Sequence, residues 1–85
     1  PHSTVNFMCK SLAKNYHLLL NYQVIQFDYG TLVFRLDRNL LNNEQDLLEK
    51  AIYDYFQNDI EYSILENETL HTKNGKYQDF ISYLE

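Results

Sequence analysis

The chain has little of several residue types, and each shortage excludes a class of protein. Its 85 residues contain no tryptophan, one cysteine, one proline and two glycines. A single cysteine cannot close an internal disulfide, so a disulfide-stapled secreted scaffold is excluded and a reducing compartment, the cytoplasm, is expected. The two isolated glycines also exclude a glycine-rich phosphate-binding loop, and no stretch has the composition of a flexible linker. We therefore expect one small domain over residues 1–85.

Positive charge is also scarce, and long apolar runs are missing. Seven lysines and arginines are scattered among twelve acidic residues, which gives a formal net charge of -5 at pH 7. That balance repels a phosphate backbone, so no nucleic-acid partner is expected. No run approaches the roughly 20 apolar residues of a membrane span, and the start lacks the features of a secretion signal. The chain opens on Pro1 rather than methionine, which suggests a piece of a longer protein.

What the chain does contain is a succession of helical and strand patterns. Apolar residues at helical spacing predict a helix over 4–15, with Ser3 as its N-terminal cap. Two runs rich in aromatic and branched residues, Tyr22 to Asp28 and Thr31 to Asp37, predict an antiparallel hairpin. Gly30 lies between them, where it can supply the positive φ that a tight turn needs.

A second helix and a third strand complete the pattern. Asn42 and Asn43 are the predicted caps of a helix with six apolar residues on one face: Leu47, Leu48, Ala51, Ile52, Tyr55 and Phe56. Alternation from Ile60 to Ile64 predicts a strand, followed by a polar loop over 66–76 and a short extended or helical piece over 77–84. The predicted fold class is α+β, a small antiparallel sheet made of the hairpin and third strand and covered on one face by two helices.

Residues that bind metals or act as nucleophiles are few and scattered. His2, His17 and His71 lie far apart and Cys9 has no second thiol, so no metal site is expected. Cys9 falls on the apolar face of the first helix, which favours a buried packing role over a nucleophile. The carboxylates cluster at the cap and on the polar face of the second helix, where solvation explains them.

The most informative segment is the run from Leu70 to Tyr77, which places Lys76 directly after a glycine. Asn-Gly is a common tight-turn dipeptide, so a merely solvated lysine is one interpretation. The segment also resembles the terminal loop of the adenylate-forming enzymes, in which the pattern Pro-Arg-Thr-x-Ser-Gly-Lys carries a catalytic lysine on a mobile C-terminal subdomain. Thr72, Gly75 and Lys76 match that pattern in register.

The resemblance extends upstream of the loop. The run from Tyr22 to Gln26 is similar to the Tyr-Gln-Ile-Val-Gln strand that opens the subdomain in the branch that includes phenylacetate-coenzyme A ligase and similar capsule-biosynthesis proteins. The run from Leu32 to Leu36 is similar to that strand's hairpin partner, and the capped helix and third strand follow in the family's order. The resemblance therefore covers about residues 22–82.

Four positions depart from the family's pattern. Leu70 replaces its proline, His71 its arginine and Asn74 its serine, and Gln78 stands where an arginine often follows. The loss of arginine at His71 and Gln78 leaves three alternatives open: weaker anchoring of a closed lid, a different acceptor, or a relative that no longer catalyses.

The resemblance implies a specific function. The chain would be the C-terminal lid of a larger ligase, with Lys76 catalytic and with Thr72, Asn74 and Gly75 shaping its loop. Its partner would be the N-terminal adenylation domain of the same chain, its cofactors ATP and Mg²⁺, and its substrates a carboxylate and possibly coenzyme A, and the isolated piece would be inactive. The alternative is a non-catalytic α+β module that self-associates through its sheet or binds a protein, with Lys76 solvated.

Overall fold

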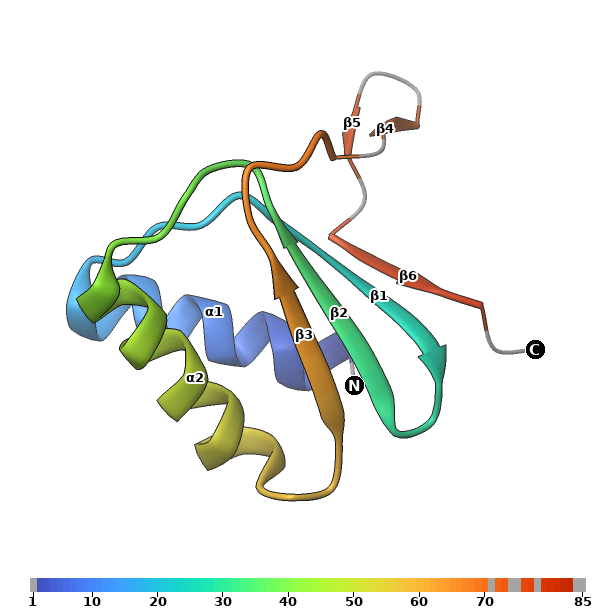
Figure 1. Ribbon diagram of the computed structural model, residues 1–85, viewed down its shortest axis with the longest axis horizontal. Helices are drawn as coiled ribbons and strands as arrows, with labels where there is room; N and C mark the ends of the chain where they lie inside the picture. Colours follow the sequence, from blue (N-terminus) through green and yellow to red (C-terminus); the bar gives the residue numbers. More distant parts are fainter. Residues whose placement is uncertain (1, 71, 74–75, 78, 84–85) are drawn as a thin grey trace. The chain divides into compact units, whose positions relative to one another are not determined.

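A computed structural model describes residues 2–70, 72–73, 76–77 and 79–83, with the backbone alone at His2, Lys73, Lys76 and Tyr77. The chain divides into two compact units, one containing the helices (Pro1–Leu20 and Leu40–Asp59) and one containing the strands (Asn21–Asn39 and Ile60–Glu85). Both kinds of element are drawn in Figure 1. The α+β class predicted from the sequence is confirmed.

The first helix, α1 (His2–Tyr16), is longer than predicted. Because it begins at His2, Ser3 is a helical residue and not the cap that its sequence position suggested. The predicted apolar face is confirmed at Val5, Met8 and Leu12, which are all buried, while Cys9 is only partly buried. The helix ends at Tyr16, because the next residue, His17, has a φ of 55° and leaves the helical region.

The second helix, α2 (Asn42–Phe56), packs against α1, and its N-cap lies one residue before the two asparagines predicted as caps. Leu41 is its N-cap and has no side-chain oxygen to offer. Instead, the Glu44 carboxylate accepts the backbone N–H of Leu41 at 3.0 Å, so one otherwise unpaired donor at the helix start is satisfied. The predicted apolar face is buried at Leu48, Ala51 and Ile52, whereas Tyr55 is exposed. Among the described residues, no helix combines the length and apolarity that a membrane crossing requires.

The predicted hairpin is confirmed as β1 (Tyr22–Asp28) and β2 (Thr31–Leu36), which pair antiparallel. Its turn is built differently from the prediction, because the φ of Gly30 is not in the left-handed region. The Asp28 carboxylate accepts the Gly30 N–H at 2.9 Å, a local side-chain bond that closes the turn without a positive φ. One irregularity in pairing, between Gln26 and Asp28, precedes this turn.

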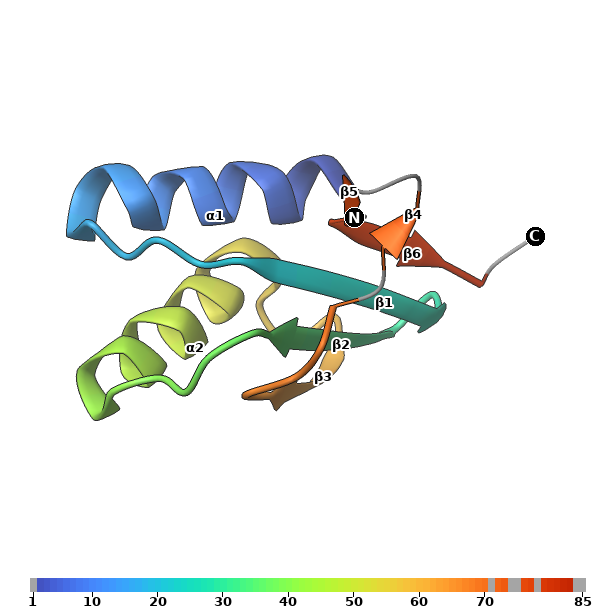
Figure 2. The same cartoon turned by 90° about the horizontal axis from the view of Figure 1, so that it is seen from above.

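The sheet is mixed, with strand order β3-β2-β1-β6, and not purely antiparallel as predicted. The third strand, β3 (Glu61–Leu65), pairs parallel with β2, because α2 intervenes and the chain returns in the same direction. The predicted last piece is extended: β6 (Phe80–Ser82) pairs parallel with β1, as Figures 1 and 2 show. That two helices cover one face of the sheet stays a prediction.

The two faces of the sheet differ in composition. Leu32, Phe34 and Leu36 alternate along β2 and are almost completely buried, and the ring of Phe34 meets that of Tyr62 edge-on at 6.2 Å. Burial of such a side chain contributes roughly 1.5–3 kcal/mol. The alternate positions of β2 point to the other face, where Arg35 lies.

Candidate functional site

The segment between β3 and β6 carries every predicted site residue. Part of it forms a two-stranded hairpin, which we call the lysine hairpin: β4 (Thr72–Lys73) pairs antiparallel with β5 (Lys76–Tyr77), as Figure 1 shows. The prediction of a loop over 66–76 is thus corrected at Thr72, which is an exposed strand residue, and at Lys76, which opens β5. Asn74 and Gly75, and with them His71 and Gln78, lie outside the described residues.

The register of the lysine hairpin places two lysines opposite each other. Lys73 and Lys76 are Cα partners, and Thr72 is the partner of Tyr77. Two positions separate the paired lysines, which is the spacing of a two-residue hairpin connection, and Asn-Gly is the sequence that favours such a connection. Two of the seven lysines and arginines of the chain therefore occupy one position of this short ladder.

The residues that lead from β3 into the lysine hairpin, 67–70, form its upstream stem, which is fixed to the end of β2 by backbone hydrogen bonds. Asn67, at a φ of 57°, donates its N–H to the Arg38 carbonyl at 3.3 Å. The next residue, Glu68, donates its N–H to the Leu36 carbonyl at 2.8 Å. Asparagine tolerates the left-handed backbone conformation better than most residues, so this reversal is compatible with its sequence. The chain leaving β3 therefore turns back across the end of β2.

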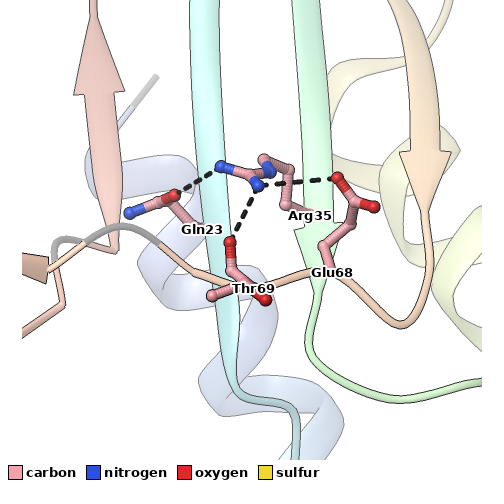
Figure 3. Close-up of polar contacts among 4 residues, drawn as sticks. All are labelled: Gln23, Arg35, Glu68 and Thr69. Atoms are coloured by element: carbon pink, nitrogen blue, oxygen red, sulfur yellow. Dashed lines mark hydrogen bonds and ion pairs between the residues drawn. The ribbon is translucent and has the colours of Figure 1, made fainter.

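The Arg35 guanidinium adds a side-chain anchor to the same stem (Figure 3). Its Nη2 donates to the Thr69 carbonyl at 2.8 Å and lies 3.5 Å from the Glu68 carboxylate, while its Nη1 donates to the Gln23 side-chain oxygen at 3.2 Å. The Arg35 side chain is 12 % exposed and that of Glu68 36 %, so this ion pair is partly shielded from water. A single planar group thus joins β1, β2 and the upstream stem.

The downstream stem consists of Asp79 and the strand β6 that follows it, and it is fixed to β1. The carbonyl of Asp79 accepts the Val24 N–H at 2.9 Å, and β6 then runs parallel to β1. The buried Gln26 continues the attachment: its backbone carbonyl accepts the Tyr83 N–H at 3.0 Å, and its side-chain oxygen accepts the Ser82 hydroxyl at 3.3 Å. Buried side-chain oxygens and nitrogens among the described residues all have a hydrogen-bond partner, so these glutamines are accommodated without an unpaired polar group.

The two stems therefore meet β1 at neighbouring residues. Arg35 links the upstream stem to Gln23, and Asp79 links the downstream stem to Val24. Because both stems are attached to the same end of the β1–β2 hairpin, the lysine hairpin is a short projection on a fixed base. Such a projection can carry a cation to a partner while its base stays in place.

Sequence reasoning missed Arg35, Gln23, Glu68 and Lys73 as parts of this site. Arg35 occupies the polar face of an alternating strand, a position that usually indicates contact with solvent. Its partner Glu68 lies 33 residues downstream, so no local pattern joins the two. One weak signal was available in the sequence. Arg35 and Gln23 fall at opposed positions of the predicted hairpin, on a strand face expected to be only partly exposed to water.

Other candidate chemistry is not assembled by the structure. His17 is exposed at the end of α1, and no group of three histidine, cysteine, aspartate or glutamate side chains that could hold a metal occurs in the described part of the chain. A shallow groove of about 200 Å³ lies between α1 and α2, lined by Tyr16, Lys50, Asp54 and Tyr55 among others. Ligand pockets usually measure roughly 300–1,000 Å³, so this groove is small for a nucleotide.

Comparison of the chain with protein-family models, curated proteins and solved structures found no match. Interpretation of the lysine hairpin therefore depends on its own geometry and on the motif resemblance around Lys76. Both concern the same short segment.

Proposed function

We propose that this chain is the C-terminal lid of an adenylate-forming ligase and that it supplies Lys76 to the activation of a carboxylate by ATP. The observation that carries the proposal is the attachment of both stems of the lysine hairpin to adjacent residues of β1, Gln23 and Val24. A catalytic cation delivered from one domain to another needs such a fixed base, because the reacting groups must be held in a near-attack geometry. Support also comes from Thr72, Gly75 and Lys76, which match the family's loop in register.

The proposed reaction has a defined place for the lysine. A carboxylate oxygen of the substrate attacks the α-phosphorus of ATP, the bond from that phosphorus to the bridging oxygen breaks, and pyrophosphate leaves with its electron pair. Negative charge accumulates on the oxygens around the α-phosphorus, and the Lys76 ammonium would stabilise it. At an effective dielectric of about 20 and a separation of ~4 Å the attraction is on the order of 4 kcal/mol, or roughly 10³-fold in rate.

The remaining components of the reaction belong to the proposed N-terminal adenylation domain. We assign Mg²⁺ to that domain together with the nucleotide whose phosphates it would bind. The acyl group would then pass from the adenylate to a thiol such as coenzyme A. The lone cysteine and the use of ATP both fit a cytoplasmic protein.

A second lysine lies beside Lys76 in the register of the lysine hairpin. Lys73 and Lys76 are Cα partners, so the hairpin carries two formal positive charges at one position of its ladder. ATP and acyl-adenylate are anions, which such a concentration of positive charge would attract. In this proposal Lys76 acts at the reacting centre, and Lys73 contributes to the local positive potential that attracts the nucleotide.

The experiment is carboxylate-dependent pyrophosphate exchange by the full-length protein that contains this chain, with Lys76→Ala as the variant. We expect acyl-adenylate formation to fall by hundreds of fold, because one cation at the reacting centre is lost. Thioester formation from a supplied acyl-adenylate should remain largely intact. Lys10→Ala, which removes an exposed lysine from α1, is the matched control and should retain wild-type exchange. Wild-type exchange by Lys76→Ala would contradict the proposal.

A second candidate function is a non-catalytic module that self-associates through its sheet. It is favoured by β3, which is an edge strand and carries the exposed side chains of Tyr62 and Leu65. Exposed edge strands can pair with a second chain. Sedimentation of the chain over a range of concentrations separates the two candidates: a dimer that Lys76→Ala leaves unchanged, in a full-length protein without carboxylate-dependent exchange, favours the module.

A further inference from the structure

Arg35 joins three segments through one guanidinium: β1, β2 and the residues that precede β4. It lies on β2, opposite Gln23 of β1, and binds the Gln23 side chain, the Glu68 carboxylate and the Thr69 carbonyl. Figure 3 shows the three acceptors arranged around its nitrogens. The side chain is 12 % exposed, more than expected for a packed core residue and much less than for a solvated surface arginine. These contacts indicate a structural role for Arg35 rather than that of a solvated surface charge.

The contacts of Arg35 fall where the upstream stem ends and the lysine hairpin begins. Glu68 and Thr69 are consecutive residues, and Thr69 precedes Lys76 by seven positions. One nitrogen, Nη2, contacts both residues, so the stem cannot shift along β2 without losing the 2.8 Å bond to the Thr69 carbonyl. The other nitrogen is tied to a fully buried glutamine, so the guanidinium itself is held. Arg35 thereby fixes the point from which the lysine hairpin projects.

We propose that Arg35 is the positioning residue of the lysine hairpin, setting the place from which Lys76 reaches the reacting phosphate. The inference rests on the proposed function, which it deepens by naming the residue that orients the cation. A displacement of about 1 Å of a reacting group can lower a rate on the order of 100-fold, so a rigid attachment of the stem has a large kinetic effect. Arg35 itself would contact no substrate atom.

The kinetic test uses Arg35→Met in the full-length protein, with pyrophosphate exchange as the assay. Methionine keeps the apolar stem of the side chain and removes every donor. We expect kcat to fall on the order of 10- to 100-fold with less than a threefold change in KM for ATP and for the carboxylate, because a positioning residue does not bind either. Arg35→Lys, which retains the charge but cannot make the fork of contacts, should recover part of the loss. A rise in KM with unchanged kcat would overturn the inference.

A double-variant comparison separates positioning from general stability. If Arg35 acts through Lys76, then adding Arg35→Met to Lys76→Ala should cause no further loss of exchange. If it acts independently of Lys76, the two losses should multiply, and the inference is wrong. Lys14→Met is the control, because it removes the charge of an exposed residue of α1 that makes no bond to the described residues of either stem, and it should change the rate by less than twofold.

Amide hydrogen exchange of the same proteins gives a readout that does not need activity. In Arg35→Met we expect backbone amides over 68–77 to exchange about tenfold faster, while those of β1 and β2 change little. Unchanged exchange over 68–77 would overturn the positioning role of Arg35 even if the ligase assignment holds. If Arg35→Met shows faster exchange over 68–77 but the wild-type protein forms no acyl-adenylate, the attachment role of Arg35 holds and the ligase assignment is rejected. The two failures are therefore distinguishable.

Discussion

The two hairpins of the sheet unit are similar in plan and different in what holds them. The β1–β2 hairpin has strands of seven and six residues with Leu32, Phe34 and Leu36 buried along one of them. The lysine hairpin has two residues in each strand. A pair of strands that short cannot stabilise itself in water. The first hairpin is held by its own apolar side chains, and the second by attachments at its two stems. A short projecting hairpin can therefore be fixed in place without a hydrophobic core of its own.

The largest expected effect tests the core of the β1–β2 hairpin. Phe34→Ala should lower the free energy of unfolding by about 3–5 kcal/mol, because it removes a buried ring and leaves a cavity. Such a loss is comparable with the whole stability of a domain of this size, on the order of 4–13 kcal/mol. Thr72→Ala, on the lysine hairpin, should change it by less than about 0.5 kcal/mol. Urea unfolding measures both, and similar losses in the two variants would remove the distinction between the hairpins.

A smaller effect tests how the turn of the β1–β2 hairpin is closed. Asp28→Ala should cost about 0.5–1 kcal/mol, because it removes the acceptor of the Gly30 N–H. Gly30→Ala should be nearly neutral, within about 0.5 kcal/mol, since its added Cβ would lie 3.9 Å from the Asp28 carboxylate and its φ is not left-handed. Thermal unfolding compares the two. A larger loss from Gly30→Ala than from Asp28→Ala would show that the glycine, and not the aspartate, shapes the turn.

The smallest effect concerns the stem of the lysine hairpin. Glu68→Gln removes one charge from a partly exposed pair whose atoms are 3.5 Å apart, so the free energy of unfolding should fall by less than about 1 kcal/mol. The difference from the wild type should shrink as salt is added, because screening already weakens the pair. Unfolding in low and high salt measures this. A loss above 2 kcal/mol would mean that the stem is an integral part of the sheet's stability and not a local attachment.

Local patterns predicted most of the elements and the β1–β2 pairing, but not the partners of β3 and β6. The β1–β2 hairpin and the buried face of α2 follow from strand and helix periodicity, and both were predicted with nearly correct bounds. The parallel pairing of β3 with β2 was not predicted, although a strand, a helix and a strand in succession favour it. The three-residue strand β6 carries too short a pattern to reveal a partner more than fifty residues away.

The candidate site was predictable only in part, for a related reason. Lys76 was identified from its own neighbours in the sequence, and the backbone hairpin around it is the arrangement that Asn-Gly favours. Arg35 was not, because its three partners come from β1 and from the segment after β3, and only the folded chain brings them together. The motif around Lys76 is local in the sequence, whereas the contacts of Arg35 are long-range.

The parallel pairing of β6 with β1 has a consequence for the order of assembly. Val24 and Phe80 become neighbours only after a loop of more than fifty residues has closed, and contacts of that separation form late and slowly. We therefore expect the downstream anchor of the lysine hairpin to form after the β1–β2 hairpin. A partly folded chain would lack the bond between Asp79 and Val24 until this distant pairing had formed.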